Sequence, residues 1–198
     1  MAGYLNEGAV SLAAANWSDA TGFAEDAVLA ITSGSQTITT SLDQSAVTNG
    51  IDTLDILPGF TGRIGGSGYG SLKLRATSGV TNRVVYNAGG GSLYLQAAGS
   101  GTNEITNFWM SSLGSCYLTG GTFVNTVLGQ GSLSVDSTTV LTTSTNLNGG
   151  SAIIQANGTG ITTLNIGGGS HVLKRGATTI NVYGRGRVTI DCSTSTIG

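Results

Sequence analysis

The chain has 198 residues, of which 33 are glycine and only 9% are charged, and its formal net charge is −2. Its length fits one domain that buries roughly 70% of its unfolded surface. The few Lys and Arg residues argue against the dense basic stripe of a nucleic-acid binder, and we expect neither an export signal nor a membrane span.

Residues 1–24, which include Tyr4, Leu5 and Trp17, show no clear period. We expect them to form an N-terminal arm or cap, because the ends of a stacked β fold need cover for their open ladder edges. Residues 25–198 then form the main domain. Its first expected strands are 28–32, 36–40 and 51–57.

From residue 70 onward, a glycine that is usually followed by serine opens a short strand seven times. Positions two and four after the glycine are mostly apolar, and position five is polar. Because side chains of a strand alternate between its faces, positions two and four should face inward. The seven glycines are Gly70, Gly91, Gly114, Gly131, Gly150, Gly169 and Gly186. The residues predicted to line the interior are Leu72, Leu74, Leu93, Leu95, Leu118, Leu133, Val135, Ile154, Leu173 and Ile190.

A second strand follows each of these, and glycine or asparagine stands at the corners between them. The pattern predicts an all-β fold, a parallel β-helix (β-solenoid) with coils of about 20 residues that stack roughly 4.8 Å apart. The alternative is a sandwich or barrel of antiparallel hairpins. Hairpins do not explain why the same glycine-serine opening recurs at every second strand, which favours the solenoid.

The candidate catalytic groups are too far apart to cooperate. Asp136 and Asp191 share position five but lie three rows apart, about 14 Å, whereas a glycosidase pair is separated by roughly 5 to 9.5 Å. Asp52 and Asp55 should point to opposite faces of a strand. His171 is the only histidine and is predicted to be buried, which disfavours a multi-histidine metal site or a hydrolase triad. We therefore expect no catalytic site, metal or cofactor, and no enzyme activity.

Other chemically notable residues have structural interpretations. Cys116 and Cys192 should lie four rows apart, roughly 19 Å, which is too far for a disulfide. The segment 65–70 is glycine-rich, but no lysine-serine pair follows it, so a corner is favoured over a phosphate-binding loop. A late basic group could meet an acidic partner or form a solvated edge that prevents end-to-end pairing; it consists of Lys174, Arg175, Arg185 and Arg187.

Position three of the repeat should face outward. It holds four apolar residues, Tyr94, Tyr117, Ile153 and Val172, together with Lys73, Ser134 and Thr189. Contiguous exposed apolar side chains usually mark a protein contact, although a loop of the same chain could also cover them. With so few charges on the surface, we expect a homotrimer in which this column or an adjacent face forms the interface.

The first third contains Asn16-Trp17-Ser18 and the segments 26–31, 42–47, 51–54 and 59–65. These segments resemble β-helical virion proteins of tailed bacteriophages. One departure is Thr21-Gly22-Phe23-Ala24-Glu25, which stands where the family has a turn rich in proline and glycine.

The resemblance implies a capsid decoration (cement) protein on the outer capsid surface of the virion, commonly a trimer that binds the major capsid protein. Attachment would then use the N-terminal arm with Tyr4, Leu5 and Trp17. The alternative is a tailspike-like β-helix that binds or degrades polysaccharide. Sugar clefts are generally lined by aromatic and acidic residues, and the two tryptophans, Trp17 and Trp109, lie in different regions, which makes this alternative weaker.

Overall fold

The chain folds almost entirely as β-strands. The computed structural model describes residues 3–24, 26–40, 42–44, 50–75, 82–98, 104–157 and 159–191. In these residues the regular elements are sixteen strands and one 3-10 turn, η1 (Ala14–Asn16). The all-β prediction is therefore confirmed.

All the strands belong to one sheet that contains two runs of pairings. The first run is β1 (Gly3–Tyr4), β2 (Val28–Gly34), β4 (Thr53–Phe60), β7 (Arg83–Tyr86), β9 (Glu104–Leu118), β10 (Gly121–Val135), β11 (Thr139–Leu147), β13 (Ile161–Ile166) and β15 (Ala177–Val182). The second run contains β3 (Thr37–Ile38), β5 (Arg63–Ile64), β6 (Leu72–Leu74), β8 (Ser92–Ala97), β12 (Ser151–Ile154), β14 (Ser170–Leu173) and β16 (Arg187–Ile190). The long strands β9 and β10 take part in both runs.

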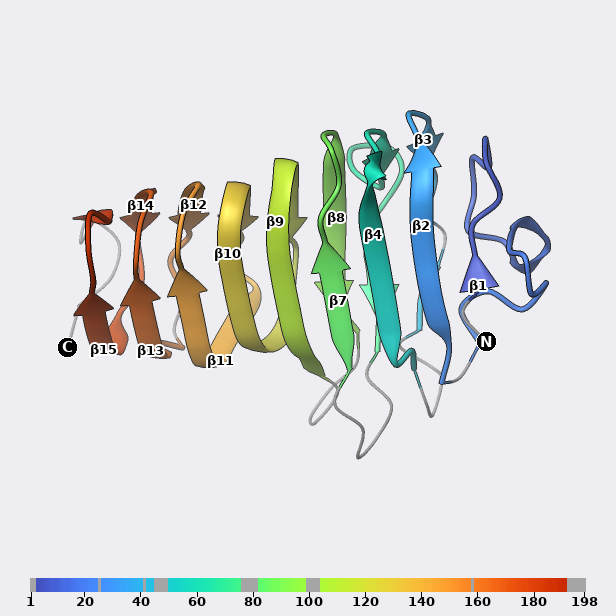
Figure 1. The fold of residues 1–198 in the computed structure, drawn as a ribbon. Coiled ribbons are helices and arrows are strands. Elements are labelled where there is room, and N and C mark those ends of the chain that lie inside the picture. The colour runs from blue at the N-terminus through green and yellow to red at the C-terminus, as the bar shows by residue number, and fades with distance from the viewer. Residues whose placement is uncertain are drawn as a thin grey trace.

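Every ladder between these strands is parallel. Figure 1 shows the strands side by side in chain order, from the N-terminal segment at one end to β15 at the other. We call the strand segments that one repeat adds to this stack a row. Antiparallel hairpins, the alternative architecture, do not occur between the described strands.

The interior follows the predicted alternation. In β8, for example, Leu93 and Leu95 are buried while Tyr94 between them points outward. All the predicted interior residues are buried except Ile190, which is 42% exposed. Ile190 lies in β16, the last described strand, which pairs on one side only. Its exposure therefore follows from its place at the end of the stack.

The first copy of the glycine-serine repeat was assigned the wrong register. Ser92 pairs with Arg63, while Leu72 pairs with Leu95. The true equivalent of Gly91 is therefore Gly62, and the segment after Gly70 is displaced by two positions. A shift of two keeps side chains on the same face, so Leu72 remains buried as predicted.

The segment 65–70 is a corner, as expected. Four of its glycines have positive φ angles, which other residues rarely adopt: Gly65, Gly66, Gly68 and Gly70. The Gly66 backbone N–H donates to the Gly70 carbonyl at 2.6 Å and closes the corner.

Residues 3–24 lie against the first row as a cap. β1 pairs with β2, and Leu5, Leu12 and Trp17 are buried in the core. The Trp17 Nε1–H donates to the Leu12 carbonyl at 3.3 Å, and the Trp17 ring meets Phe23 edge to face at 5.3 Å. The segment thus covers one end of the core with large side chains.

Arg175 corrects the idea that all the late basic residues form a solvated edge. Its side chain is fully buried and donates hydrogen bonds to three carbonyl oxygens, those of Gln155 at 2.7 Å, Thr139 at 2.7 Å and Asp136 at 2.9 Å. Burial lowers the pKa of Arg175 to about 10, against the opposing effect of Asp136. The guanidinium joins three successive rows from the inside.

Candidate interaction surfaces

The outward column is the main surface that the repeat predicts. Its members pair in register from row to row: Tyr94, Tyr117, Ser134, Ile153, Val172 and Thr189. Ile153 is 45% exposed, and the two tyrosines and Val172 are half-buried. In the described residues no loop covers Ile153, so at this point the column faces outward as predicted. Lys73, in contrast, pairs with Gln96 and lies outside the column.

The two tyrosines of the column form a rigid stack. Their ring centroids are 4.4 Å apart and their planes are inclined by 12°. On the other side of Tyr94, the Arg63 guanidinium lies 5.3 Å from the ring centroid, and it is also 5.7 Å from the ring of Tyr69. Such cation–π contacts contribute about 0.5–1 kcal/mol each at exposed sites. This surface is therefore preorganised before any partner binds.

Sequence reasoning missed Arg63 and Tyr69 as members of this cluster. The signal was the register: Arg63 precedes Ile64 as Ser92 precedes Leu93. Aligning Gly70 instead of Gly62 with Gly91 removed Arg63 from the aligned rows.

A second outward surface lies on the first run of strands. Val85, Trp109 and Val127 pair in register on β7, β9 and β10. Trp109 is 44% exposed, while its neighbour Phe108 is buried in the core. We call Val85, Trp109 and Val127 the tryptophan column. An ion pair borders this column, with Arg83 Nη2 3.0 Å from the Asp55 carboxylate. Alternation within β9 was the signal for Trp109, which the repeat did not include.

Beyond the tryptophan column, the same face carries a ladder of amide side chains. The Nδ2 group of Asn165 donates to Asn146 at 2.8 Å, and that of Asn181 donates to Asn165 at 2.9 Å. Asn125 donates to Asn107 at 3.3 Å, and Ser144 donates to Asn125 at 3.0 Å. These side chains satisfy one another along the stack, as amide ladders do in stacked sheets, so their role is to fasten rows together.

The residues predicted for attachment occupy different environments. Tyr4 is 49% exposed, whereas Leu5 and Trp17 are buried in the cap. Burial places the side chains of Leu5 and Trp17 in the core, away from any partner surface. An attachment role therefore remains a prediction for Tyr4, with Leu5 and Trp17 acting as the packing that holds the cap in place.

The carboxylates considered for catalysis are engaged in local structure. Asp136 accepts hydrogen bonds from the backbone N–H groups of Thr138 and Thr139, both at 2.9 Å, and so stabilises a turn. Asp191 lies 3.8 Å from Lys174. The register of β10, β12, β14 and β16 keeps Asp136 and Asp191 three rows apart. The structure thus does not bring this pair together.

His171 and Cys116 lie inside, as predicted. His171 is buried, and its Nε2 lies 2.6 Å from the Gly168 carbonyl, so this nitrogen carries the proton and donates it. Cys116 is a buried free thiol, and burial raises its pKa above the usual value. Cys192 lies outside the described residues. In the described part of the chain, no group of three His, Cys, Asp or Glu side chains could hold a metal ion.

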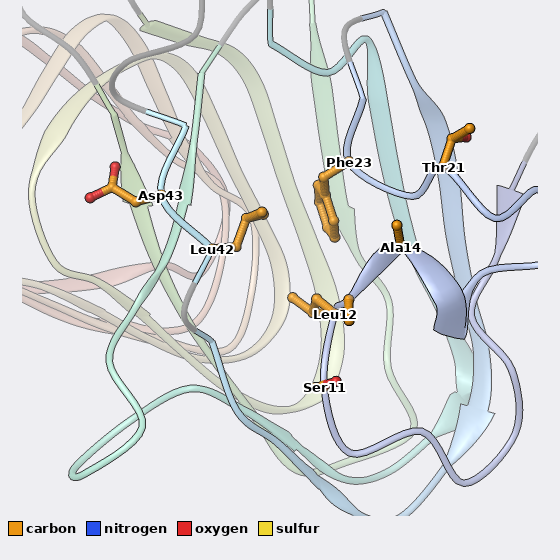
Figure 2. Close-up of a pocket in the computed structure, with 8 residues that line it drawn as sticks. Ser11, Leu12, Ala14, Thr21, Phe23, Leu42 and Asp43 are labelled. Atoms are coloured by element: carbon orange, nitrogen blue, oxygen red, sulfur yellow. The ribbon is translucent and has the colours of Figure 1, made fainter.

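A hollow of about 470 Å³ lies between the cap and residues 42–43. Figure 2 shows Phe23 and Leu42 on one side of it and Leu12 and Ala14 on the other. The Asp43 carboxylate at its rim is held by Lys73 Nζ at 2.7 Å. The walls combine apolar side chains with the polar residues Ser11, Thr21 and Asp43, and this mixed lining does not define a ligand.

Comparison of the chain with protein families, curated proteins and solved structures gave no match. Among the described residues, no helix has the length and apolar character needed to cross a membrane.

Proposed function

We propose that this protein is a parallel β-helix that acts as a capsid decoration (cement) protein of a tailed bacteriophage, without catalysis. It binds the major capsid protein on the outer surface of the virion as a homotrimer. The observation that carries this proposal is the outward column, where the stacked pair Tyr94 and Tyr117 and the pair Ile153 and Val172 lie on one face of a regular parallel stack, with Ser134 between the two pairs. Contiguous exposed apolar surface marks protein contacts.

The β-helix part of the proposal is supported by how the two runs of strands share a core. Residues of the first run, such as Leu54 and Val84, and residues of the second run, such as Leu93 and Leu95, belong to one buried cluster. β9 and β10 pass from one run to the other without interruption. A chain that winds around a single core produces this arrangement.

A structural role also agrees with the state of the carboxylates. Asp136 stabilises a turn, Asp55 pairs with Arg83, and Asp43 pairs with Lys73. A tailspike-like enzyme needs two acids at a separation that suits attack on a glycosidic bond. These three acids instead hold the fold together, which favours the decoration protein over the polysaccharide-degrading alternative.

Binding to capsids tests the proposal. Purified protein should sediment with capsids that lack it, and Tyr4→Asp should weaken that binding because a charge replaces an exposed aromatic contact. The matched control is Ala15→Asp, which adds the same charge at another exposed position of the cap without removing an aromatic ring. Failure of the unmodified protein to bind capsids would contradict the proposal.

A further inference from the structure

The two ends of this chain differ in charge: residues 1–24 hold Glu7 and Asp19 without any Lys or Arg, whereas residues 170–191 hold Lys174, Arg175, Arg185 and Arg187 against Asp191. Every Lys and Arg lies at or after Arg63. Most of the acids precede it, namely Glu7, Asp19, Glu25, Asp26, Asp43, Asp52 and Asp55. Because the strands stack in chain order (Figure 1), this division along the sequence becomes a division along the molecule. The molecule is acidic at the cap and basic at the end that carries β14, β15 and β16.

At the basic end, the described residues leave apolar side chains of the interior exposed. Val182 and Ile190 point inward, because they pair with Ile166 and Leu173, which are buried. Val182 is nevertheless 54% exposed. In the described residues no further strand pairs with the outer edges of β15 and β16. Such an edge, with apolar side chains beside it, is a template for association.

The positive charges stand next to this open edge. Arg185 and Arg187 are both exposed, between β15 and the end of β16. Tyr183, also exposed, adds an aromatic side chain to the same edge. The end of the stack thus combines apolar side chains, an aromatic ring and two guanidinium groups.

The cap presents the complementary properties. Its exposed acids are Glu7 and Asp19, and it also exposes Val10 and the small apolar residues Ala13 and Ala15. The Asp19 carboxylate accepts hydrogen bonds from the backbone N–H groups of Gly22 and Thr21, which lower its pKa and keep it ionised. The cap is therefore a negatively charged surface with apolar patches.

We infer that the basic end of one molecule binds the acidic cap of a second copy, so that molecules associate head to tail along the stack axis. The opposite charges and the open apolar edge support this occupant. A head-to-tail contact is heterologous and does not close on itself, so it adds molecules in a line. The inference does not rest on the proposed capsid role, and it uses a different surface from the outward column.

Sedimentation velocity at increasing protein concentration tests this contact. The Debye length falls from about 30 Å at roughly 0.01 M salt to about 3 Å at roughly 1 M salt. The sedimentation coefficient should therefore rise with concentration at low salt, and this rise should be lost at high salt. A coefficient that stays constant at low salt would overturn the inference.

A matched pair of variants separates the local effect from net charge. Arg185→Gln with Arg187→Gln should abolish the rise of the sedimentation coefficient with protein concentration at low salt. Ser111→Glu with Thr143→Glu changes the net charge equally, at exposed positions in the middle of the stack, and should leave the rise intact. If the sedimentation coefficients of the two variants depend on concentration in the same way, the basic end does not take part in the contact.

Mixing reversed-charge variants gives the sharpest test. Arg185→Glu with Arg187→Glu makes the basic end acidic, and Glu7→Arg with Ala15→Arg makes the cap basic. Each variant alone should fail to associate, while an equimolar mixture should associate, because each end then meets an end of opposite charge. A mixture that stays unassociated would overturn the inference. Adding Tyr117→Asp and Ile153→Asp to both variants shows whether the association is independent of the outward column.

Discussion

At the residue scale, Arg175 shows how a charged side chain becomes part of the interior. A buried charge is costly unless hydrogen bonds compensate for lost water. Arg175 meets this need with three backbone carbonyls, two in the corner that contains Asp136 and Thr139 and one at Gln155 in the next row. It therefore connects rows in a way that an apolar side chain of similar volume cannot.

Replacing Arg175 should destabilise the fold. Arg175→Met leaves the carbonyl of Gln155 and two others without their guanidinium donors, and each lost partner costs about 1–3 kcal/mol. We expect the free energy of unfolding in urea to fall by about 3 kcal/mol. Arg185→Met, at an exposed position, is the control and should change stability by less than about 0.5 kcal/mol. Equal stability of the two variants would contradict the idea that Arg175 holds neighbouring rows together.

A corner glycine gives a second prediction at this scale. Gly91 has a φ of +72°, and a Cβ there would collide with the Gly62 carbonyl oxygen of the previous row. Gly91→Ala should lower the free energy of unfolding by about 2 kcal/mol or more. Gly176→Ala is the control, because nothing lies within 4 Å of its added Cβ. Thermal unfolding of both variants checks the prediction, and an undisturbed Gly91→Ala protein would show that this corner relaxes easily.

At the element scale, the strands were predictable because each repeat carries the same alternation. Leu93, Leu118 and Leu173 are buried as their offset from a glycine predicts. The register of the first copy was not predictable, because the corner at 65–70 adds residues between Gly62 and Leu72 and displaces the count. Contacts between rows, such as Arg63 over Tyr94, depend on that register and were missed with it.

The alternation of apolar residues also could not predict that Arg175 and Trp17 are buried. Arg175 directly follows Lys174, which points outward, and only the sharp corner between β14 and β15 turns its side chain inward. Trp17 sits in a segment without a period, so its place in the core follows from tertiary contacts with Leu12 and Phe23.

The outward column leads to a prediction at the element scale. Tyr117→Asp together with Ile153→Asp should convert the proposed trimer to a folded monomer, because each apolar side chain contributes roughly 1.5–3 kcal/mol when fully buried in an interface. Both side chains point away from the interior, so circular dichroism should remain that of the unmodified protein. Size-exclusion chromatography with light scattering measures the mass. A double variant that remains trimeric would remove the column from the interface.

At the scale of the whole molecule, the stack carries four surfaces at different places. The outward column lies along the second run of strands, and the tryptophan column lies along the first run. The two charged ends lie at the cap and at β16. Several surfaces on one stack allow a molecule to bridge its neighbours, as the proposed decoration role requires.

The location of the chain on virus particles tests the proposed role most directly. We predict that mass spectrometry of purified virions from the source of this sequence detects the chain, and that antibodies against it label intact particles on the outer capsid surface. A chain that is absent from purified virions, or that is labelled only at the tail, would contradict a decoration protein.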